Sequence, residues 1–294
     1  MANSKIACLY YVPKLDGLEN SFDISSDIKI CNSSNSYEAG AFFELVKRNR
    51  LLNVGDPSNY SLCVVFNKHL FSADFNEPYS LINRFANILA INTTSPIVEG
   101  NVIETLNDFK STKYLGQHYS FTHSKFEHFQ DLFGVLDLNG LNDLKSMWSN
   151  YSSVWENEKA SCRLSNALTF FYHAWNSQYM ESFCINLSIV FELLFAPHAH
   201  SETSHQLSYN VSRFIAKNKD ERESVYKVMK KFYGRRSSII HGGLPDEEKI
   251  IEPTKNAFVL GSVILKSILL DPKLTEIFND ENQRKGLMKS FVFG

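Results

Sequence analysis

The feature that most constrains the fold is a long stretch without glycine. From Leu141 to Tyr233 the chain has no glycine in 93 residues, and Pro197 is the only proline. Glycine and proline are the residues that most strongly interrupt helices, so their scarcity favours a series of helices joined by short turns.

Apolar side chains in this stretch recur at helical spacing. Steps of three and four residues connect two sets: Leu164, Leu168, Phe171 and Trp175, and Phe183, Leu187, Val190, Phe191 and Leu194. Each set falls on one face of a helix. Pro197 should end the second helix, because the residue before a proline is disfavoured in the α region.

Three more helices are expected after Pro197. One begins near Ser201 or Thr203, and another begins at Asp220, where Glu223 has the spacing of a capping box. The Asp220 helix should end at Gly242-Gly243 and bury Val225, Val228, Met229, Phe232, Ile239 and Ile240. The last helix fits 254–270 and is closed by Asp271-Pro272. The second half is thus predicted to be a bundle of four or more helices.

The first half has a mixed pattern. Residues 5–12, 60–67 and 113–123 are rich in β-branched and aromatic residues, which indicates strands, whereas 36–49 and 77–91 look helical. The predicted fold class is α+β: a mixed α/β domain over 1–138, with a sensing or regulatory role, and a helical domain over 139–294. The boundary is expected between Gly134 and Gly140.

Composition restricts the location and the cofactors. The net charge of −2 excludes a globally basic nucleic-acid binder, and the start of the chain lacks the pattern of a secretory signal. The longest apolar stretch, 257–270, is short and interrupted by Lys266, so we expect a cytoplasmic protein with no membrane span. Five scattered cysteines lack zinc-site spacing and are expected to be reduced: Cys8, Cys31, Cys63, Cys162 and Cys184. His198, His200 and His205 are expected in a solvated loop, so neither metal nor cofactor is predicted.

Charged residues gather towards the end of the Asp220 helix. Residues 213–236 contain nine Lys or Arg and three Asp or Glu, and Arg236 falls on the side expected to be buried. A buried guanidinium is costly unless an anion or hydrogen-bond acceptor meets it. The spacing of Arg236 and His241 leaves two interpretations open: a phosphate-handling site, or two cations that favour the negative end of the helix dipole.

The stretch Arg163–Gly243 resembles a HEPN domain of the Apea-like branch. The resemblance includes Glu192 within the apolar run 188–194, and an arginine followed after four to six residues by histidine. Arg236, Ser237, His241 and Gly242 match this motif, and Arg235 also satisfies the looser spacing.

The resemblance implies a four- to five-helix bundle that forms a homodimer, in which two Arg–His motifs face each other. It also implies a metal-independent endoribonuclease that acts on RNA in bacterial anti-phage defense or a toxin–antitoxin pair. An antitoxin or a phage-derived trigger would then be a partner. The alternative is a catalytically inactive HEPN module that binds RNA, a nucleotide or a protein as a scaffold.

Site roles follow from the resemblance. His241 would move protons, Arg236 would hold the phosphate, Ser237 would bind a phosphate oxygen or orient His241, and Glu192 would orient Arg236 or His241. A purely structural role for Glu192 is equally well supported, in which its carboxylate pairs with a buried arginine. The residues expected to contact the substrate are Arg235, Tyr233 and Lys231, although Tyr233 also suits packing at a dimer interface.

Overall fold

The chain forms two compact units, each of which has its own core. One unit contains 1–121 and 130–148, and the other contains 122–129 and 149–294. The computed structural model describes residues 5–11, 14–32, 62–67, 77–94, 98–106, 111–117, 129, 132, 134–156, 163–196, 204–243 and 247–293. An antiparallel sheet in one unit and helices in the other confirm the α+β class.

The first unit is built on a six-stranded sheet in the order β3-β4-β5-β1-β6-β7, in which all neighbours are antiparallel. The strands are β1 (Lys5–Tyr11), β3 (Ser21–Asp23), β4 (Ile28–Asn32), β5 (Leu62–Asn67), β6 (Val98–Leu106) and β7 (Ser111–Gln117). A separate parallel pair joins β2 (Lys14–Leu15) to β8 (Val135–Leu136). The strands predicted at 5–12 and 60–67 are confirmed, and the strand predicted at 113–123 is confirmed as far as Gln117.

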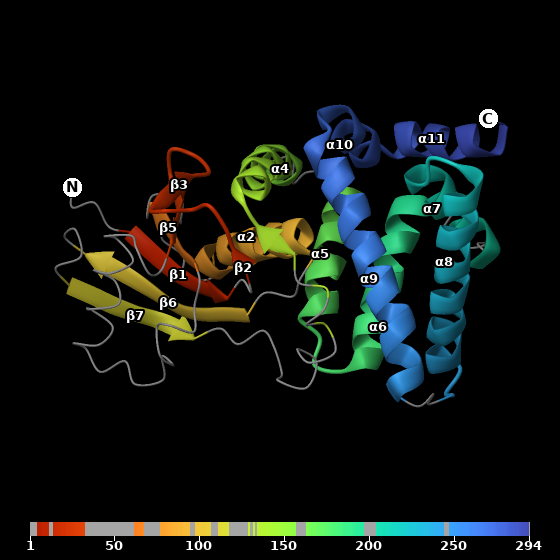
Figure 1. Cartoon of the computed structure of the whole chain (residues 1–294), viewed down its shortest axis with the longest axis horizontal. Coiled ribbons are helices and arrows are strands. Elements are labelled where there is room, and N and C mark those ends of the chain that lie inside the picture. Colours follow the sequence, from red (N-terminus) through yellow and green to blue (C-terminus); the bar gives the residue numbers. More distant parts are fainter. Residues whose placement is uncertain are drawn as a thin grey trace. The chain divides into compact units, whose positions relative to one another are not determined.

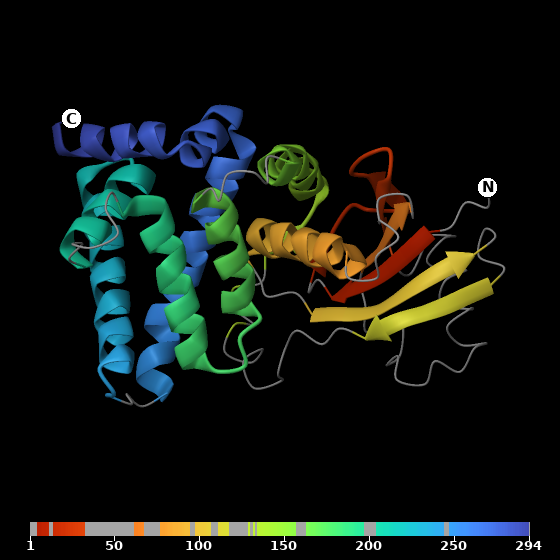
Figure 2. The same cartoon turned by 180° about the vertical axis from the view of Figure 1, so that it is seen from behind.

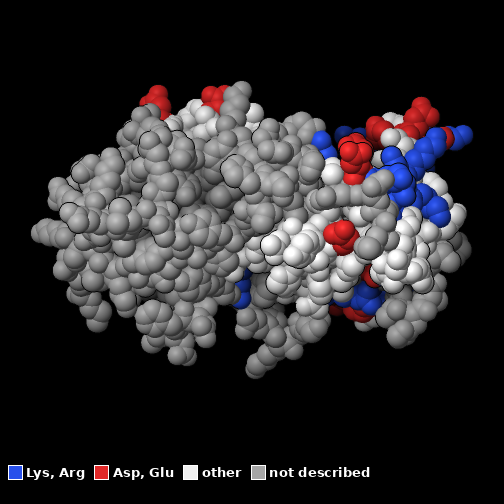
Figure 3. Space-filling model, turned by 90° about the horizontal axis from the view of Figure 1, so that it is seen from below, with Lys and Arg blue, Asp and Glu red and all other residues white. Residues whose placement is uncertain are grey.

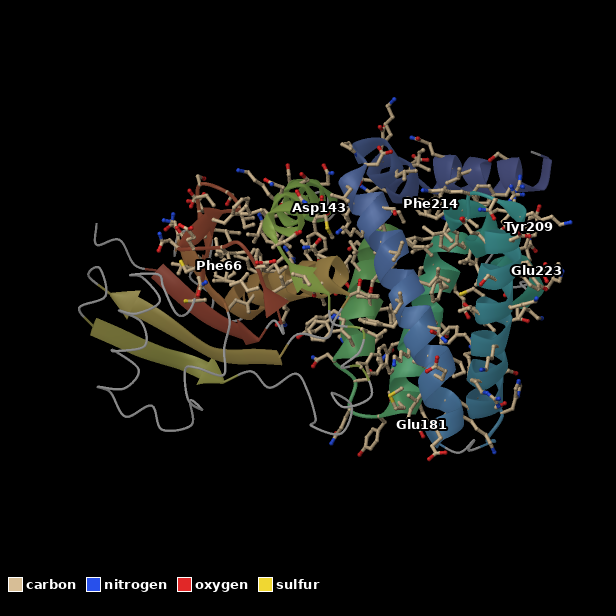
Figure 4. The ribbon with its side chains drawn as sticks, in the orientation of Figure 1. Phe66, Asp143, Glu181, Tyr209, Phe214 and Glu223 are labelled. Atoms are coloured by element: carbon tan, nitrogen blue, oxygen red, sulfur yellow. The ribbon has the colours of Figure 1, made fainter. Side chains whose placement is uncertain are left out.

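Helix α2 (Glu77–Thr93) confirms the helix predicted at 77–91 and packs on this sheet. The ring of Phe85 meets the ring of Phe66 edge-on, with a centroid distance of 5.7 Å. The Phe85 ring also packs against Trp148 of α4 (Leu138–Glu156), with a centroid distance of 5.6 Å. Figure 4 labels Phe66 within this core. The helix predicted at 36–49 lies outside the described residues.

The division between the units falls inside α4, later than the predicted boundary. The first half of α4 belongs with the sheet because Asn92 of α2 donates a hydrogen bond to the Gly140 carbonyl at 2.9 Å. Gly140 therefore takes part in a contact within the first unit and does not mark the end of that unit.

The second unit is a helical bundle, as the sequence predicted. Its helices are α5 (Arg163–Trp175), α6 (Met180–Phe195), α7 (Ser204–Ile215), α8 (Lys219–Ile240), α9 (Glu247–Leu270), α10 (Pro272–Asn279) and α11 (Glu281–Phe293). Helices α5, α6, α8 and α9 run side by side, and α10 and α11 lie across one end (Figures 1 and 2).

Apolar side chains of these helices form one core. Both predicted sets on α5 and α6 are buried. Phe258 of α9 stacks on Phe171 at 5.2 Å, and Phe129 stacks on Phe183 at 5.3 Å. Phe214, labelled in Figure 4, packs against Phe195 and Phe278 near the crossing helices. Aromatic packing therefore fixes α6 and α9 as the centre of the bundle.

Two helix starts differ from prediction. The N-cap of α8 is Asn218, whose side chain accepts the Glu221 N–H at 2.9 Å, while the Glu221 carboxylate accepts the Lys217 N–H at 2.8 Å. The predicted cap at Asp220 is wrong by two residues, because the Asn218 side chain already caps the free backbone amide of Glu221. Helix α9 starts at Glu247, before the predicted start, and includes Pro253.

Among the described helices, α9 alone is long and apolar enough to cross a membrane by its length and composition. The span runs from Glu248 to Leu270, and 56% of its most apolar window is buried inside the unit. Ile264, Leu265, Ile268 and Leu269 are all buried. These buried side chains make α9 part of the core of the second unit.

Candidate functional site

The centre of the candidate site is an ion pair between two helices. The Nη2 atom of Arg236 on α8 lies 3.1 Å from Oε1 of Glu192 on α6. Both side chains are partly buried, with exposed fractions of 32% and 37%. The apolar faces of α6 and α8 force this approach, because Phe191 and Phe232 pack at 5.9 Å between the same helices.

Partial burial changes the chemistry of both groups. Burial raises the pKa of the Glu192 carboxyl above its ordinary value, and the Arg236 guanidinium partly offsets this effect. The Nε atom of Arg236 is buried and has no hydrogen-bond partner among the described residues. The guanidinium is thus held at one end and retains a donor that the described part of the chain does not satisfy.

Cys184 of α6 and Thr254 of α9 are buried, and Cys184 lies near enough to Arg236 to be affected by its charge. Burial raises the pKa of the Cys184 thiol to about 11, although the Thr254 hydroxyl and the Arg236 charge lower it. The thiol is therefore neutral near pH 7 and acts as a small apolar group. Sequence reasoning missed both residues, since they fall among the apolar positions of their helices with no motif around them.

The end of α8 is a complete Schellman motif, which confirms the predicted stop. His241 is the C-cap, and Gly242 follows with φ +78°. The Gly242 N–H donates to the Ile239 carbonyl at 3.2 Å, and the Gly243 N–H donates to the Ser238 carbonyl at 2.9 Å. The two glycines therefore have a structural reason, and they leave the His241 side chain exposed.

Arg236 and His241 do not share a side of α8 within one chain. Five residues correspond to a rotation of about 140° around an α-helix. Arg236 turns towards Glu192 on α6, whereas His241 is exposed at the end of the bundle. That end also holds the start of α6, where Figure 4 labels Glu181.

Tyr233 is in the core rather than on the surface. It is 6% exposed, and its hydroxyl donates to the Ser188 carbonyl of α6 at 3.0 Å. Residues spaced by four drift about 40° per step around a helix. Tyr233 is therefore buried, whereas Ser237 and His241, one and two turns later, are exposed. This burial favours packing within one chain over contact with substrate or a second copy.

The remaining predicted residues lie nearer the surface. Lys231 and Ser237 are exposed, and Arg235 is half-buried. Ile240, predicted to be buried, is 47% exposed because it occupies the last position of α8 at an open end of the bundle. Val225, Val228 and Ile239 are only half-buried.

A second charged cluster, which sequence reasoning missed, closes the other end of α6. Arg284 is fully buried and donates to the carbonyls of Leu194 at 3.0 Å and Ala196 at 2.8 Å. Glu281 pairs with Arg284 and Arg163, each at 3.1 Å. The spacing of Glu281 and Arg284 on one helix was the available signal, but nothing in it indicated burial.

The histidines that the structure describes outside the site show no metal-binding arrangement. Among the described residues no group of three or more His, Cys, Asp or Glu side chains could hold a metal ion. His205 is exposed on α7 and meets the Tyr226 ring edge-on at 5.6 Å. His198 and His200 lie outside the described residues. Cys31, Cys63 and Cys184 are buried and are not joined in disulfides, as expected.

Comparison with known proteins gave no match: no family model, no curated protein and no solved structure is significantly similar to this chain. The functional assignment therefore depends on the site itself and on the motif resemblance.

Proposed function

We propose that the chain is a HEPN-type endoribonuclease that cleaves RNA without a divalent metal ion as a cytoplasmic homodimer. The observation that carries this proposal is the Arg236–Glu192 ion pair. The pair fixes the motif arginine one to two turns before an exposed histidine at a glycine-capped helix end. The helical bundle around it supports the proposal, because the resemblance implies a bundle of four to five helices.

In the proposed reaction the ribose 2′-oxygen attacks the adjacent phosphorus atom, and the bond from phosphorus to the 5′-oxygen breaks. One His241 imidazole takes the proton of the 2′-hydroxyl, and the second copy's imidazole gives a proton to the 5′-oxygen. Imidazole suits both steps because it titrates near neutrality. The products are a 2′,3′-cyclic phosphate and a 5′-hydroxyl.

Arg236 stabilises the negative charge that builds on the phosphate. A guanidinium presents several donors in a fixed plane, so it can keep its contact with Glu192 and offer other N–H groups to phosphate oxygens. Glu192 then acts as a positioning residue, and exposed Ser237 is free to donate to a phosphate oxygen.

A second copy supplies what one chain lacks. Since Arg236 and His241 lie about 140° apart around α8, a composite site needs a second motif facing the first. Ile240 supports such an interface, because this large apolar side chain is 47% exposed immediately beside His241. Burying it against a second copy would remove apolar surface from water.

A non-catalytic scaffold is the second candidate. It is favoured by the same ion pair, since Arg236 is already engaged by Glu192 and turned away from His241. In that case the helical unit would bind RNA, a nucleotide or a protein partner without cleaving it.

The proposed setting is a bacterial anti-phage defense system or toxin–antitoxin pair. An RNA-cleaving enzyme harms its own cell unless it is restrained, so the first unit would sense a phage-derived trigger or a neutralising antitoxin would bind the dimer.

Incubation of tRNA and total RNA with the protein in EDTA separates these candidates. The wild type should produce fragments with 2′,3′-cyclic phosphate ends, whereas Arg236→Ala should lose cleavage. Lys273→Gln, which changes an exposed lysine on α10, should cleave as the wild type does. Intact RNA after incubation with the wild type would favour the scaffold.

A further inference from the structure

The C-terminal half of α8 carries a surface that is basic and free of acidic residues. From Ser224 to Gly243 the chain has five Lys or Arg and no Asp or Glu. The net charge of the whole chain is −2, so this local excess of positive charge stands against an acidic remainder. Figure 3 shows Lys and Arg side chains gathered over part of the helical unit.

Six residues of this half share one side of the helix. At 100° per residue they fall within an arc of about 140°, and four of them are exposed while Arg235 and Ser238 are half-buried. We call this surface the basic face of α8; it consists of Lys230, Lys231, Gly234, Arg235, Ser238 and His241. Arg236 lies on the opposite side, with Glu192.

The charges of this face are not neutralised within the described part of the chain. Lys231 and Arg235 have no ion-pair partner among the described residues, and Lys230 donates only to the uncharged Ser204 hydroxyl at 3.0 Å. Lys227, one turn earlier, differs because it is paired with Glu223 at 2.6 Å. The uncompensated charge on this face therefore runs from Lys230 to Arg235.

The middle of the basic face has a low centre at Gly234, where no side chain rises from the helix backbone. A Cβ atom added at Gly234 would meet nothing within 4 Å, and the Ser238 hydroxyl folds back to donate to the Gly234 carbonyl at 3.1 Å. An exposed glycine inside a helix costs up to about 1 kcal/mol relative to alanine, and no neighbour in the described chain requires it. A ligand that approaches the helix backbone closely would account for it.

We infer that the basic face of α8 binds the phosphate backbone of single-stranded RNA and leads the strand to His241. Charge complementarity selects a polyanion, and the low centre admits a backbone between Lys231, Arg235 and Lys230. The distance along the helix from Lys230 to His241 is about 17 Å, which exceeds the separation of neighbouring phosphates. This inference rests on the proposed function for the identity of the ligand as RNA, but it concerns binding and not cleavage.

The test measures binding separately from cleavage. A fluorescent oligo(U) RNA is titrated with the full-length His241→Ala protein, and with the same protein carrying Lys231→Gln and Arg235→Gln, between about 50 mM and about 200 mM salt. The double substitution should weaken binding at low salt about tenfold or more. It should also reduce the slope of log K against log salt by about 1.4, since each phosphate contact on a single strand contributes about 0.7.

Two further variants make the result specific. Lys273→Gln removes an exposed lysine on α10 and should change neither affinity nor slope. Gly234→Gln adds no charge and improves helix propensity, yet it should weaken RNA binding severalfold by filling the low centre. Unchanged binding by the Lys231/Arg235 variant would overturn the inference, as would the absence of RNA binding by the parent protein. Binding that depends on this face in a wild type unable to cleave RNA would uphold the inference and reject the nuclease.

Discussion

The Nη2 atom of Arg236 lies 3.1 Å from Oε1 of Glu192, and this contact joins two helices that are far apart in the sequence. It connects the structural and the proposed catalytic roles of the helical unit. The pair holds α8 against α6, and it fixes the guanidinium that the proposed reaction needs.

Removing either partner should destabilise the fold. A double-mutant cycle of Glu192→Gln and Arg236→Gln, measured by urea unfolding, should give a coupling free energy of about 1 kcal/mol. The matched control is the Glu223–Lys227 pair on the outer side of α8 (Figure 4), which is far more exposed and should couple less. Equal coupling in the two cycles would contradict a special role for the inner pair.

The raised pKa of Glu192 gives this pair a pH dependence. Because the folded state holds the Glu192 proton more tightly than the unfolded state does, the contribution of this carboxyl group to stability is greatest below the ordinary pKa of glutamate and is lost as pH rises through the folded value. The free energy of unfolding of the wild type, relative to Glu192→Gln, should therefore fall as pH rises above the ordinary pKa of glutamate. Parallel profiles, or a relative gain with pH, would show that burial does not control this carboxyl.

The two glycines of α8 should respond oppositely to alanine. Gly242→Ala should lower the free energy of unfolding by about 1 kcal/mol, since its φ of +78° disfavours a side chain. Gly234→Ala should raise it by up to about 1 kcal/mol, because the added Cβ meets nothing within 4 Å. Thermal unfolding of both variants checks the signs, and a destabilised Gly234→Ala would mean that α8 has a neighbour at this position.

Arg284 should be the most sensitive charged residue of the bundle. Arg284→Ala leaves the carbonyls of Leu194 and Ala196 without their donor and should cost about 3–5 kcal/mol. Lys285→Gln, which touches the same Glu281 from a more exposed position, should cost little. A small effect of Arg284→Ala in urea unfolding would show that water replaces the guanidinium easily.

Local patterns in the sequence predicted much of the fold. The apolar steps of α5 and α6 identified buried side chains correctly, because one face of a helix in a bundle must meet the core. Pro197 and Gly242 marked helix ends for reasons of backbone geometry alone. The capping residue of α8 was misplaced because Asn218 and Asp220 are both good N-caps, and only the hydrogen bonds distinguish them.

Contacts between distant segments could not be predicted in the same way. The sequence placed Arg236 on a buried side and named Glu192 as one candidate partner, but the distance between them depends on how α6 and α8 pack. The hydrogen bond from Tyr233 to Ser188 and the burial of Arg284 depend on the same packing. Ile240 was predicted to be buried from its position on the apolar side of α8. It is exposed instead, because the bundle ends there.

The most direct test of the central claim is RNA cleavage in EDTA by the wild type and by His241→Ala, with analysis of the product ends. The account predicts that the wild type releases fragments ending in 2′,3′-cyclic phosphate and 5′-hydroxyl groups, and that His241→Ala, folded to the same extent, loses this activity by about a hundredfold or more. Full cleavage by His241→Ala would contradict the proposed mechanism.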